Sequence, residues 1–417
     1  MSIKENQLIE TKIIDQNNNG EGIAKINGMV VFINETLKED IVNIKITQIK
    51  KNFARGKVVT TIKNSSERTT PPCIYYSECG GCNLQHQDYI HQLKFKEKKI
   101  KNALEKIGEL KNVNVNSILH GEDYNYRNKV SLKVNGQSIG FYKKISNDIV
   151  NVNECIISDK KINNIIRIIR KFINDYNCNN IKEIIIRTSN NNEILLSIHT
   201  DKFNLSKEIY NLLNNEINTL IIDNKLIFGN GYITESVLNL KFKVSHSSFF
   251  QVNKYMTETL FYTVLKQVEN IKNMVVLDLY CGTGTLTLLF AKHAKKAIGI
   301  ENHNNSIINA KENAKLNKIN NVDFILGKVE DKIDSIINKR IDIIVLDPPR
   351  KGSDKKTLNA IVKINPLKII YVSCDPVTLA RDLNFLEYKG YKTVNIQPID
   401  MFPNTMHVEC VVLLEKK

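Results

Sequence analysis

The stretch NMVVLDLYCGTGTLTL, residues 273–288, places an apolar strand directly before a loop of small residues and the start of a helix. Four similar apolar runs follow it: KKAIGIE (295–301), VDFILG (322–327), IDIIVLDPP (341–349) and LKIIYVSC (367–374). Strands that are apolar on both faces are typical of a parallel sheet covered by helices. We therefore predict an α/β domain over 246–417, with two final strands, YKTVNIQPID and HVECVVLLEK, forming an antiparallel edge pair.

The loop DLYCGTGTLTL (278–288) indicates a nucleotide-like ligand. Small residues let backbone amides approach a ligand, and Glu301, at the end of the next strand, can bind both ribose hydroxyls. Dinucleotides and S-adenosylmethionine both fit such a loop. The loop lacks the G-x-G-x-x-G spacing suited to a pyrophosphate, which favours S-adenosylmethionine over a dinucleotide. A glycine turn without a ligand is the plainer alternative, and Cys281 is interpreted as a small packed residue.

Two further strand ends carry candidate functional residues. LDPPR (346–350) places Asp347 at the carboxyl edge of the sheet, where doubly wound folds bind ligands. Arg350 stands where amine methyltransferases carry an aromatic residue, which argues against amine methylation. Cys374, in YVSCDPVTLARD (371–382), is either a packed core cysteine or a nucleophile, and the helix that follows would favour its thiolate.

Residues 1–62 read as a small β-barrel, with short Val-, Ile- and Thr-rich runs separated by Gly and Asn turns. Residues 63–245 are predicted to form a central α+β domain. It includes an amphipathic, lysine-rich helix over 87–107, in a helical region 87–119 that is a candidate for packing with the catalytic domain, and a second helix near 158–175.

The sequence CIYYSECGGC places Cys73, Cys79 and Cys82 in C-x5-C-x2-C spacing, and Cys155 follows in NVNECII. Four thiolates can hold a [4Fe–4S] cluster or a tetrahedral zinc ion. Zinc knuckles usually show two C-x2-C pairs and this stretch has one, so we favour the cluster. The spacing also differs from the C-x3-C-x2-C motif of radical enzymes. Cys178 has no partner motif and is interpreted as incidental.

Composition limits the class of protein. The 417 residues are 42% hydrophobic and 25% charged, as in a soluble globular protein of two or three domains. No apolar run is long enough for a membrane helix and the N-terminus has no signal core, so we expect a cytoplasmic protein. We also expect it to be a monomer. A net charge of +15 favours a nucleic acid partner, although a Lys-, Asn- and Ile-rich composition alone raises the charge.

Together these motifs resemble the bacterial RNA uracil-5-methyltransferases, in particular the 23S ribosomal RNA branch with an iron–sulfur cluster and an N-terminal TRAM module. The tRNA-modifying relatives are expected to lack both the module and the cysteines. The matching stretches are CIYYSECGGCNLQHQ (73–87), YRNKVSLKV (126–134), IGFYKKISNDIVNVNECII (139–157), SSFFQVN (247–253), DLYCGTGTLTL (278–288), LDPPRKG (346–352), YVSCDPVTLARDL (371–383) and MFPNTMHVEC (401–410).

The resemblance implies a class I S-adenosylmethionine-dependent methyltransferase fold and a role for six residues. It implies that the cofactor contacts are Gln251, Tyr280, Glu301 and Asp347. Cys374 falls on the nucleophile, which adds to carbon 6 of uracil so that carbon 5 can accept a methyl group. Glu409 falls on the general base that removes the carbon-5 proton, with His407 as a second candidate or as a residue that orients Glu409.

The expected function is therefore formation of 5-methyluridine in 23S ribosomal RNA, on a uridine extruded from its stack. Arg127, Asn128 and Lys129 are candidates for RNA contact, whereas Arg381 could either bind uracil or cap its helix. Two alternatives stay open: a methyltransferase acting on tRNA, and a non-catalytic RNA-binding or ribosome-assembly factor built on the same fold. The joint presence of Cys374, Glu409 and the cofactor loop argues against the second.

Overall fold

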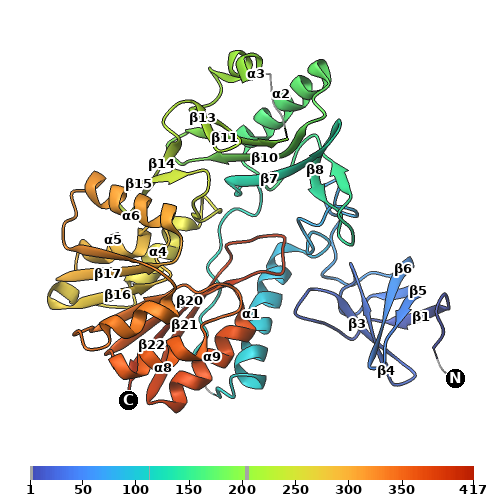
Figure 1. Ribbon diagram of the computed structural model, residues 1–417. Coiled ribbons are helices and arrows are strands. Elements are labelled where there is room, and N and C mark those ends of the chain that lie inside the picture. Colours follow the sequence, from blue (N-terminus) through green and yellow to red (C-terminus); the bar gives the residue numbers. More distant parts are fainter. Residues whose placement is uncertain (1–2, 112, 202–205) are drawn as a thin grey trace. The chain divides into compact units, whose positions relative to one another are not determined.

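The computed structural model describes residues 3–111, 113–201 and 206–417 (Figure 1). The chain divides into two compact units. The first holds the chain through Lys99 with Tyr142–Asp148 and Phe402–Met406, and the second holds Ile100–Phe141, Ile149–Met401 and His407–Lys417. Within the described ranges, none of the helices is both long and apolar enough to cross a membrane.

The N-terminal part of the first unit is a six-stranded sheet in the order β1-β5-β6-β4-β3-β2. In β5, Val42, Ile44 and Ile46 are buried and alternate with more exposed residues, as expected for a strand with one face toward a core. The predicted small β unit is therefore confirmed. Its strands are β1 (Leu8–Lys12), β2 (Asp15–Gln16), β3 (Gly22–Ile26), β4 (Met29–Ile33), β5 (Ile41–Ile49) and β6 (Phe53–Lys63).

The second unit contains a central seven-stranded sheet in the order β13-β12-β11-β10-β7-β8-β9. Its apolar face packs on α2 (Lys160–Tyr176) and α3 (Ser206–Leu213). Cys178 is buried in this core, which fits its interpretation as a packed residue. The strands are β7 (Lys129–Asn135), β8 (Ser138–Tyr142), β9 (Ile149–Asn151), β10 (Ile181–Thr188), β11 (Ile194–Thr200), β12 (Thr219–Ile222) and β13 (Lys225–Phe228).

The catalytic sheet has the order β18-β17-β16-β19-β20-β22-β21, parallel except at β22. The predicted α/β sheet and its antiparallel edge pair are confirmed. Its strands are β16 (Val275–Leu279), β17 (Lys296–Glu301), β18 (Val322–Leu326), β19 (Ile343–Leu346), β20 (Lys368–Ser373), β21 (Tyr391–Ile399) and β22 (Glu409–Lys416).

Helices cover both faces of this sheet (Figure 1). Strand order reverses beside β16, so the loops after β16 and β19 meet at a position where doubly wound folds bind ligands. The helices are α4 (Thr257–Leu265), α5 (Thr285–Ala291), α6 (Asn304–Leu316), α7 (Val329–Lys332), α8 (Lys355–Ile364) and α9 (Pro376–Tyr388), with 3-10 turns η1 (Ile271–Asn273) and η2 (Ile333–Ile336).

The amphipathic helix predicted over 87–107 is confirmed as α1, which spans Tyr89–Lys106, but it does not extend to residue 119. At Gly108 an added Cβ would lie 3.1 Å from the carbonyl oxygen of Ala380, so this position packs closely on α9. Val115 and Leu119 then form parallel bridges to Ile396 and Ile399 of β21. The alternating sequence VNVN suits this extended pairing better than a helix, which explains why the helix ends before this segment.

A two-stranded hairpin, β14 (Tyr232–Val237) and β15 (Leu240–Ser245), attaches to α6 through asparagines. Asn317 bonds both the N–H and the carbonyl of Lys241, and Asn313 does the same for Lys243. These side chains satisfy backbone groups on β15 as a neighbouring strand would. The amide of Asn313 also donates to the carbonyl of Thr283, so the hairpin and the cofactor loop share a partner.

Candidate active site

The loop after β16 has the backbone that close approach to a ligand requires. Tyr280, Gly282 and Gly284 adopt positive φ angles of 66°, 54° and 80°. A Cβ on Gly284 would lie 3.0 Å from Ala310 and 3.1 Å from Phe324, so only glycine fits there. A Cβ on Gly282 would meet nothing within 4 Å, which leaves space beside this backbone for a ligand.

Glu301 is held toward this loop. Its Oε2 accepts from the Gly282 N–H at 3.0 Å, and its Oε1 accepts from the His303 N–H at 2.8 Å. Cys281 is buried under β17: a Cβ on Gly299 would approach its Sγ to 2.7 Å. The packed interpretation of Cys281 therefore holds, and Glu301 presents a fixed carboxylate beside the open glycine.

Asp278, the fourth residue of β16 and the acid that precedes the glycine loop, is a further candidate for contact with polar groups of a ligand. It is 1% exposed, and its Oδ2 accepts a hydrogen bond of 2.6 Å from the Thr287 hydroxyl. Burial, with the nearby negative charges of Asp347 and Glu301, raises the pKa of Asp278 to about 7. In the sequence, its position shortly before the glycine loop marks it as a possible ligand contact.

Strand register brings the predicted nucleophile and base together. Ser373 pairs with Cys410 in the antiparallel β20–β22 ladder, so Cys374, one residue on, falls opposite Glu409. Directly opposed residues project from the same face of a sheet, whereas Cys410 projects from the other face. Cys410 is fully buried, and Glu409 is 4% exposed.

The surroundings of Cys374 oppose its ionisation. Burial, followed by the charges of Glu409 and Asp347, raises its pKa to about 11, while Arg350 acts in the opposite direction. In the resting site, burial and the carboxylates therefore favour the neutral thiol, while a stabilising effect of the α9 N-terminus on the thiolate stays a prediction. The N-terminal amides of Val377 and Thr378 already bond the side chain of Asp375.

The two carboxyl groups near Cys374 are also perturbed. Burial, with the charge of Asp347, raises the pKa of Glu409 well above its ordinary range. Burial raises the pKa of Asp347 to about 7. Asp347 and Arg350 thus influence the pKa values of both Cys374 and Glu409, so the four side chains lie near one another.

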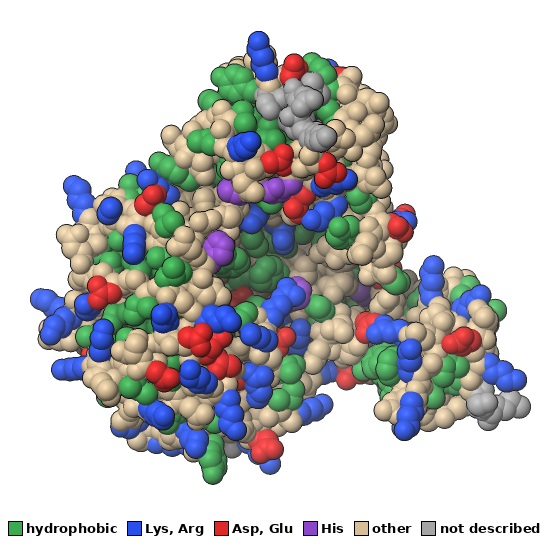
Figure 2. Space-filling model, viewed as in Figure 1, with side chains coloured by type: hydrophobic (Ala, Val, Ile, Leu, Met, Phe, Trp, Pro, Cys, Tyr) green, Lys and Arg blue, Asp and Glu red, His purple; other side chains and the backbone are tan. Residues whose placement is uncertain are grey.

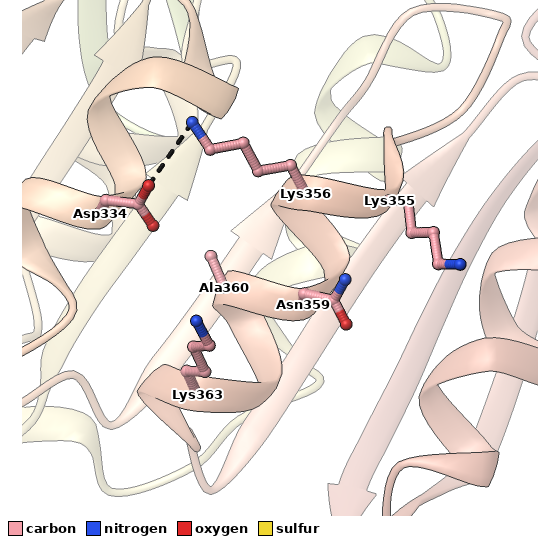
Figure 3. A pocket seen from close by; sticks show the side chains of 6 residues that line it. All are labelled: Asp334, Lys355, Lys356, Asn359, Ala360 and Lys363. Carbon is pink, nitrogen blue, oxygen red and sulfur yellow. Dashed lines mark ion pairs between the residues drawn. The ribbon is translucent and has the colours of Figure 1, made fainter.

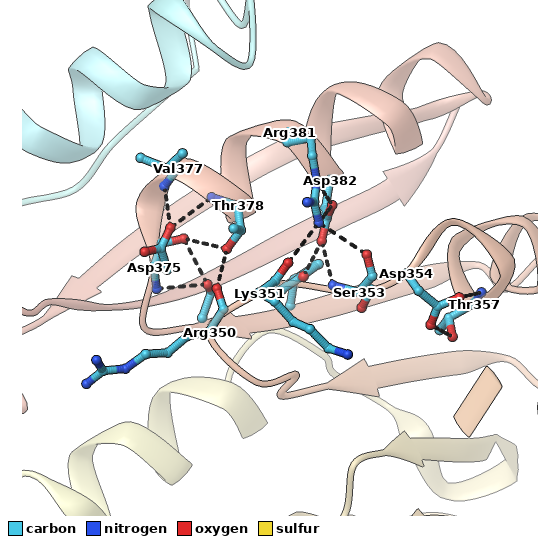
Figure 4. A network of polar contacts seen from close by, with 12 residues as sticks. Arg350, Lys351, Ser353, Asp354, Thr357, Asp375, Val377, Thr378, Arg381 and Asp382 are labelled. Carbon is cyan, nitrogen blue, oxygen red and sulfur yellow. Dashed lines mark hydrogen bonds and ion pairs between the residues drawn. The ribbon is translucent and has the colours of Figure 1, made fainter. Parts of the chain in front are cut away.

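A polar network holds the loop after β19 against α9 (Figure 4). Arg381 donates to the carbonyls of Lys351 and Ser353, both at 3.2 Å, and pairs with buried Asp382. Asp382 in turn accepts from the Ser353 N–H and, at 2.6 Å, from the Tyr371 hydroxyl. Arg381 therefore anchors this loop rather than simply capping a helix.

Gln251 and Tyr280 lie on separate segments. Tyr280 is half-buried, and its hydroxyl lies near Thr357 and Ser353. Gln251 is buried and its carbonyl accepts from the side-chain amide of Asn128 at 3.4 Å. Asn128 is itself buried, which argues against its predicted role in direct RNA contact.

The cysteine loop offers a donor set whose chemistry fits a metal cluster. The side chains of Cys73, Cys79, Cys82 and Cys155 are each partly exposed. The Sγ of Cys79 accepts from the Gly81 N–H at 3.4 Å, and turns closed by the Tyr76 and Cys79 amides fold the loop. Across the described part of the chain, no three His, Cys, Asp or Glu side chains converge to hold a metal ion, so the predicted [4Fe–4S] cluster is not shown and stays a prediction.

Basic side chains are widely spread. Figure 2 shows lysines and arginines interspersed with acids over the visible face of the described chain. One basic depression, with a volume of about 410 Å³, lies along α8 (Figure 3). It is lined by Lys355, Lys356 and Lys363, and Lys356 forms an ion pair with Asp334 at 3.5 Å.

The seven-stranded sheet with one reversed strand, the glycine loop after β16 and the acid ending β17 define an S-adenosylmethionine-dependent methyltransferase fold. The solved structure of Pyrococcus abyssi tRNA (uracil-54, C5)-methyltransferase in complex with S-adenosyl-L-homocysteine shares this fold. The TM-score is 0.80 at 24% identity, over 97% of this chain and 100% of that one.

Sequence comparison identifies the family. The sequence model of the tRNA (uracil-5-)-methyltransferase family matches residues 88–417, and that of the TRAM domain matches residues 4–59. An uncharacterized RNA methyltransferase of Clostridium acetobutylicum is 40% identical over 99% of this chain and 98% of that protein. A similarly named protein of Oceanobacillus iheyensis is 36% identical over 100% and 98%. The chain belongs to the RNA uracil-5-methyltransferase family and carries a TRAM domain.

Proposed function

We propose that this methyltransferase forms 5-methyluridine in 23S ribosomal RNA through a covalent bond between Cys374 and carbon 6 of uracil. The observation that carries the proposal is the register that sets Cys374 opposite Glu409, at the ligand edge of a methyltransferase sheet. A non-catalytic RNA-binding factor would have no need for a buried carboxyl beside a thiol at this edge. Burial of the Glu409 carboxyl costs free energy, so stability does not account for its presence, whereas a catalytic role does.

Each proposed step falls to a residue of this pocket. The Cys374 thiol loses its proton to solvent, and the thiolate adds to carbon 6; the electron pair of the carbon 5–carbon 6 double bond moves into an enolate, which makes carbon 5 electron-rich. S-adenosylmethionine, when bound, supplies the electrophilic methyl group, and Gln251, Tyr280, Glu301 and Asp347 are proposed to hold it. Glu409 then takes the carbon-5 proton, and the bond between Cys374 and carbon 6 breaks. A carboxylate with a raised pKa is a stronger base, which suits Glu409 to this step.

The covalent step is tested with RNA containing 5-fluorouridine, whose carbon-5 substituent cannot leave as a proton. The enzyme with S-adenosylmethionine and this RNA should form an adduct that survives denaturation and maps to the Cys374 peptide. Cys374→Ala should form none, whereas Cys178→Ala, which changes a cysteine in the central core, should form as much as the native enzyme. An undiminished adduct in Cys374→Ala would remove the assignment.

A tRNA substrate is the second candidate. The fold of a tRNA enzyme covers 97% of this chain, so a full-length match that includes the barrel region does not by itself indicate ribosomal RNA. This weakens the expectation that tRNA enzymes lack the module. The cysteine motif is then the feature that favours the ribosomal substrate. Mapping 5-methyluridine in both RNAs of a deletion strain decides: loss from 23S ribosomal RNA supports the proposal, and loss from tRNA alone contradicts it.

We also propose that Cys73, Cys79, Cys82 and Cys155 bind a [4Fe–4S] cluster. Three thiols on one glycine-containing loop, one of them already accepting a backbone N–H, support this assignment. An anaerobic preparation should contain about four iron and four sulfide per chain and absorb visible light. Cys79→Ser should lose most of the iron while Cys178→Ser keeps it. A colourless protein containing zinc would overturn the cluster.

A further inference from the structure

The segment that carries Gln251 is held by residues of the central sheet rather than by strands of the catalytic sheet. Arg187, in β10, donates from Nη1 to the carbonyl of Ser248 and from Nη2 to that of Phe250, both at 3.4 Å. The backbone N–H of Asn128 donates to the carbonyl of Val252 at 2.9 Å, and its side chain donates to that of Gln251. Four carbonyls within residues 248–252 therefore accept from Arg187 and Asn128.

Arg187 is an unusual residue for this task because its guanidinium is buried. The side chain is 2% exposed, and its Nε has no hydrogen-bond partner among the described residues. Glu235, itself 4% exposed, supplies the nearby negative charge, and its carboxylate accepts from the Asn190 N–H at 3.1 Å. A buried ion held in this way is often no more stable than an apolar residue of similar size, so stability alone does not explain it.

The other end of the segment is fixed to the catalytic domain. The side-chain amide of Asn309, in α6, donates to the hydroxyls of Ser245 and Ser248 at 3.0 and 2.5 Å. Ser248 is thus contacted by Arg187 through its carbonyl and by Asn309 through its hydroxyl. The backbone that precedes Gln251 is therefore held both by Arg187 of the central sheet and by Asn309 of α6.

We propose that Arg187 is a positioning residue for S-adenosylmethionine binding, acting through the carbonyls that flank Gln251. The inference rests on the proposed role of Gln251 as a cofactor contact. Without the two guanidinium donors, the segment has lost half of its central-sheet hydrogen bonds, and Gln251 samples orientations that do not meet the cofactor. Loss of these donors is therefore expected to weaken cofactor binding more than it slows the chemical step.

The test measures S-adenosyl-L-homocysteine affinity by calorimetry, without RNA. Arg187→Met keeps an unbranched side chain, although a shorter one, and removes the donors. We expect the affinity for S-adenosyl-L-homocysteine to fall about 2- to 12-fold, the range for a lost hydrogen bond. The Michaelis constant for S-adenosylmethionine should rise by a similar factor while kcat at saturation changes less. Arg187→Lys, which keeps the charge and one donor, should recover part of the affinity and carries the test if Arg187→Met does not fold.

Arg170→Met is the matched control. Arg170, on α2, also donates to two backbone carbonyls, those of Ile139 and Val152, but these lie away from the Gln251 segment in sequence. The Arg170→Met variant should have a lower melting temperature than the native protein and an unchanged affinity for S-adenosyl-L-homocysteine. Equal losses of affinity in Arg170→Met and Arg187→Met would mean general destabilisation and would overturn the inference.

The double variant separates this inference from the role of Gln251. If Arg187 acts through Gln251, then Arg187→Met added to Gln251→Ala should weaken binding no further. Unchanged affinity in Gln251→Ala would refute the cofactor role of Gln251 and the inference with it. Weaker binding in Gln251→Ala together with native affinity in Arg187→Met would refute the inference alone.

Discussion

The pKa of Cys374 predicts how slowly the resting enzyme reacts with a thiol reagent. Its surroundings raise the pKa from 9.0 to about 11, so at pH 8 the thiolate fraction falls about 100-fold, from about 10% to about 0.1%. A thiolate of higher pKa is more nucleophilic, and a Brønsted coefficient of about 0.4–0.5 restores about tenfold. We therefore expect Cys374 to react about tenfold more slowly than an ordinary thiol at pH 8.

The assay follows methyl methanethiosulfonate modification of the Cys374 peptide by mass spectrometry between pH 7 and pH 10, with the urea-unfolded protein as reference. The rate in the folded protein should rise about tenfold per pH unit through pH 10, whereas the reference should level near pH 9. Steric shielding alone would slow the reaction equally at every pH. Glu409→Gln removes the largest raising charge and should bring the levelling point down. A folded-state profile that levels below pH 9 would refute the reasoning.

Three further changes have definite expected outcomes. Gly352→Ala places a Cβ at φ 74°, 2.6 Å from the Arg381 guanidinium, and should lower the free energy of unfolding by about 1–3 kcal/mol in urea denaturation; a loss near zero would contradict the fit. Asp278→Asn removes a carboxyl whose pKa rises from 3.8 to about 7 on folding, a shift that makes the native protein less stable as pH rises from 4 to 7. The melting temperature of Asp278→Asn relative to the native protein should therefore increase from pH 4 to pH 7, and an unchanged difference would show that this carboxyl does not titrate as inferred. Replacing Lys355 and Lys363 by Ala should reduce the salt dependence of RNA binding by about 0.7 in log–log slope per lost phosphate contact; an unaltered slope would place the RNA elsewhere.

The sequence predicts the catalytic sheet well because its strands are long apolar runs with acids or small residues at their ends. The antiparallel pairing of β21 with β22 could also be predicted, since no helix lies between these two strands. The proximity of Cys374 and Glu409 depends instead on the register of β22 on β20. The register itself was not accessible. A slip of one residue would have turned Glu409 to the other face, and only the packing of both strands fixes it.

Other contacts give no local signal. The asparagines of α6 that bond β15 are indistinguishable in sequence from the many other asparagines of this chain, because their role depends on a strand 60 or more residues away. Arg187 lies in the strand IKEIIIRTS, which also carries Lys182 and Glu183, so its charge does not distinguish it in the sequence. Its carbonyl partners are residues 248 and 250, which become neighbours only after the chain folds.

The proposed reaction makes opposite demands on one pocket. Glu409 must be basic enough to take a proton from carbon, which its burial beside Asp347 provides by raising its pKa. The same burial and the same carboxyl groups raise the pKa of Cys374, although an early step needs its thiolate. One low-polarity environment therefore strengthens the late base and holds the early nucleophile as a neutral thiol. Arg350 is a cation whose charge lowers both pKa values, so it favours release of the Cys374 proton and at the same time weakens Glu409 as a base.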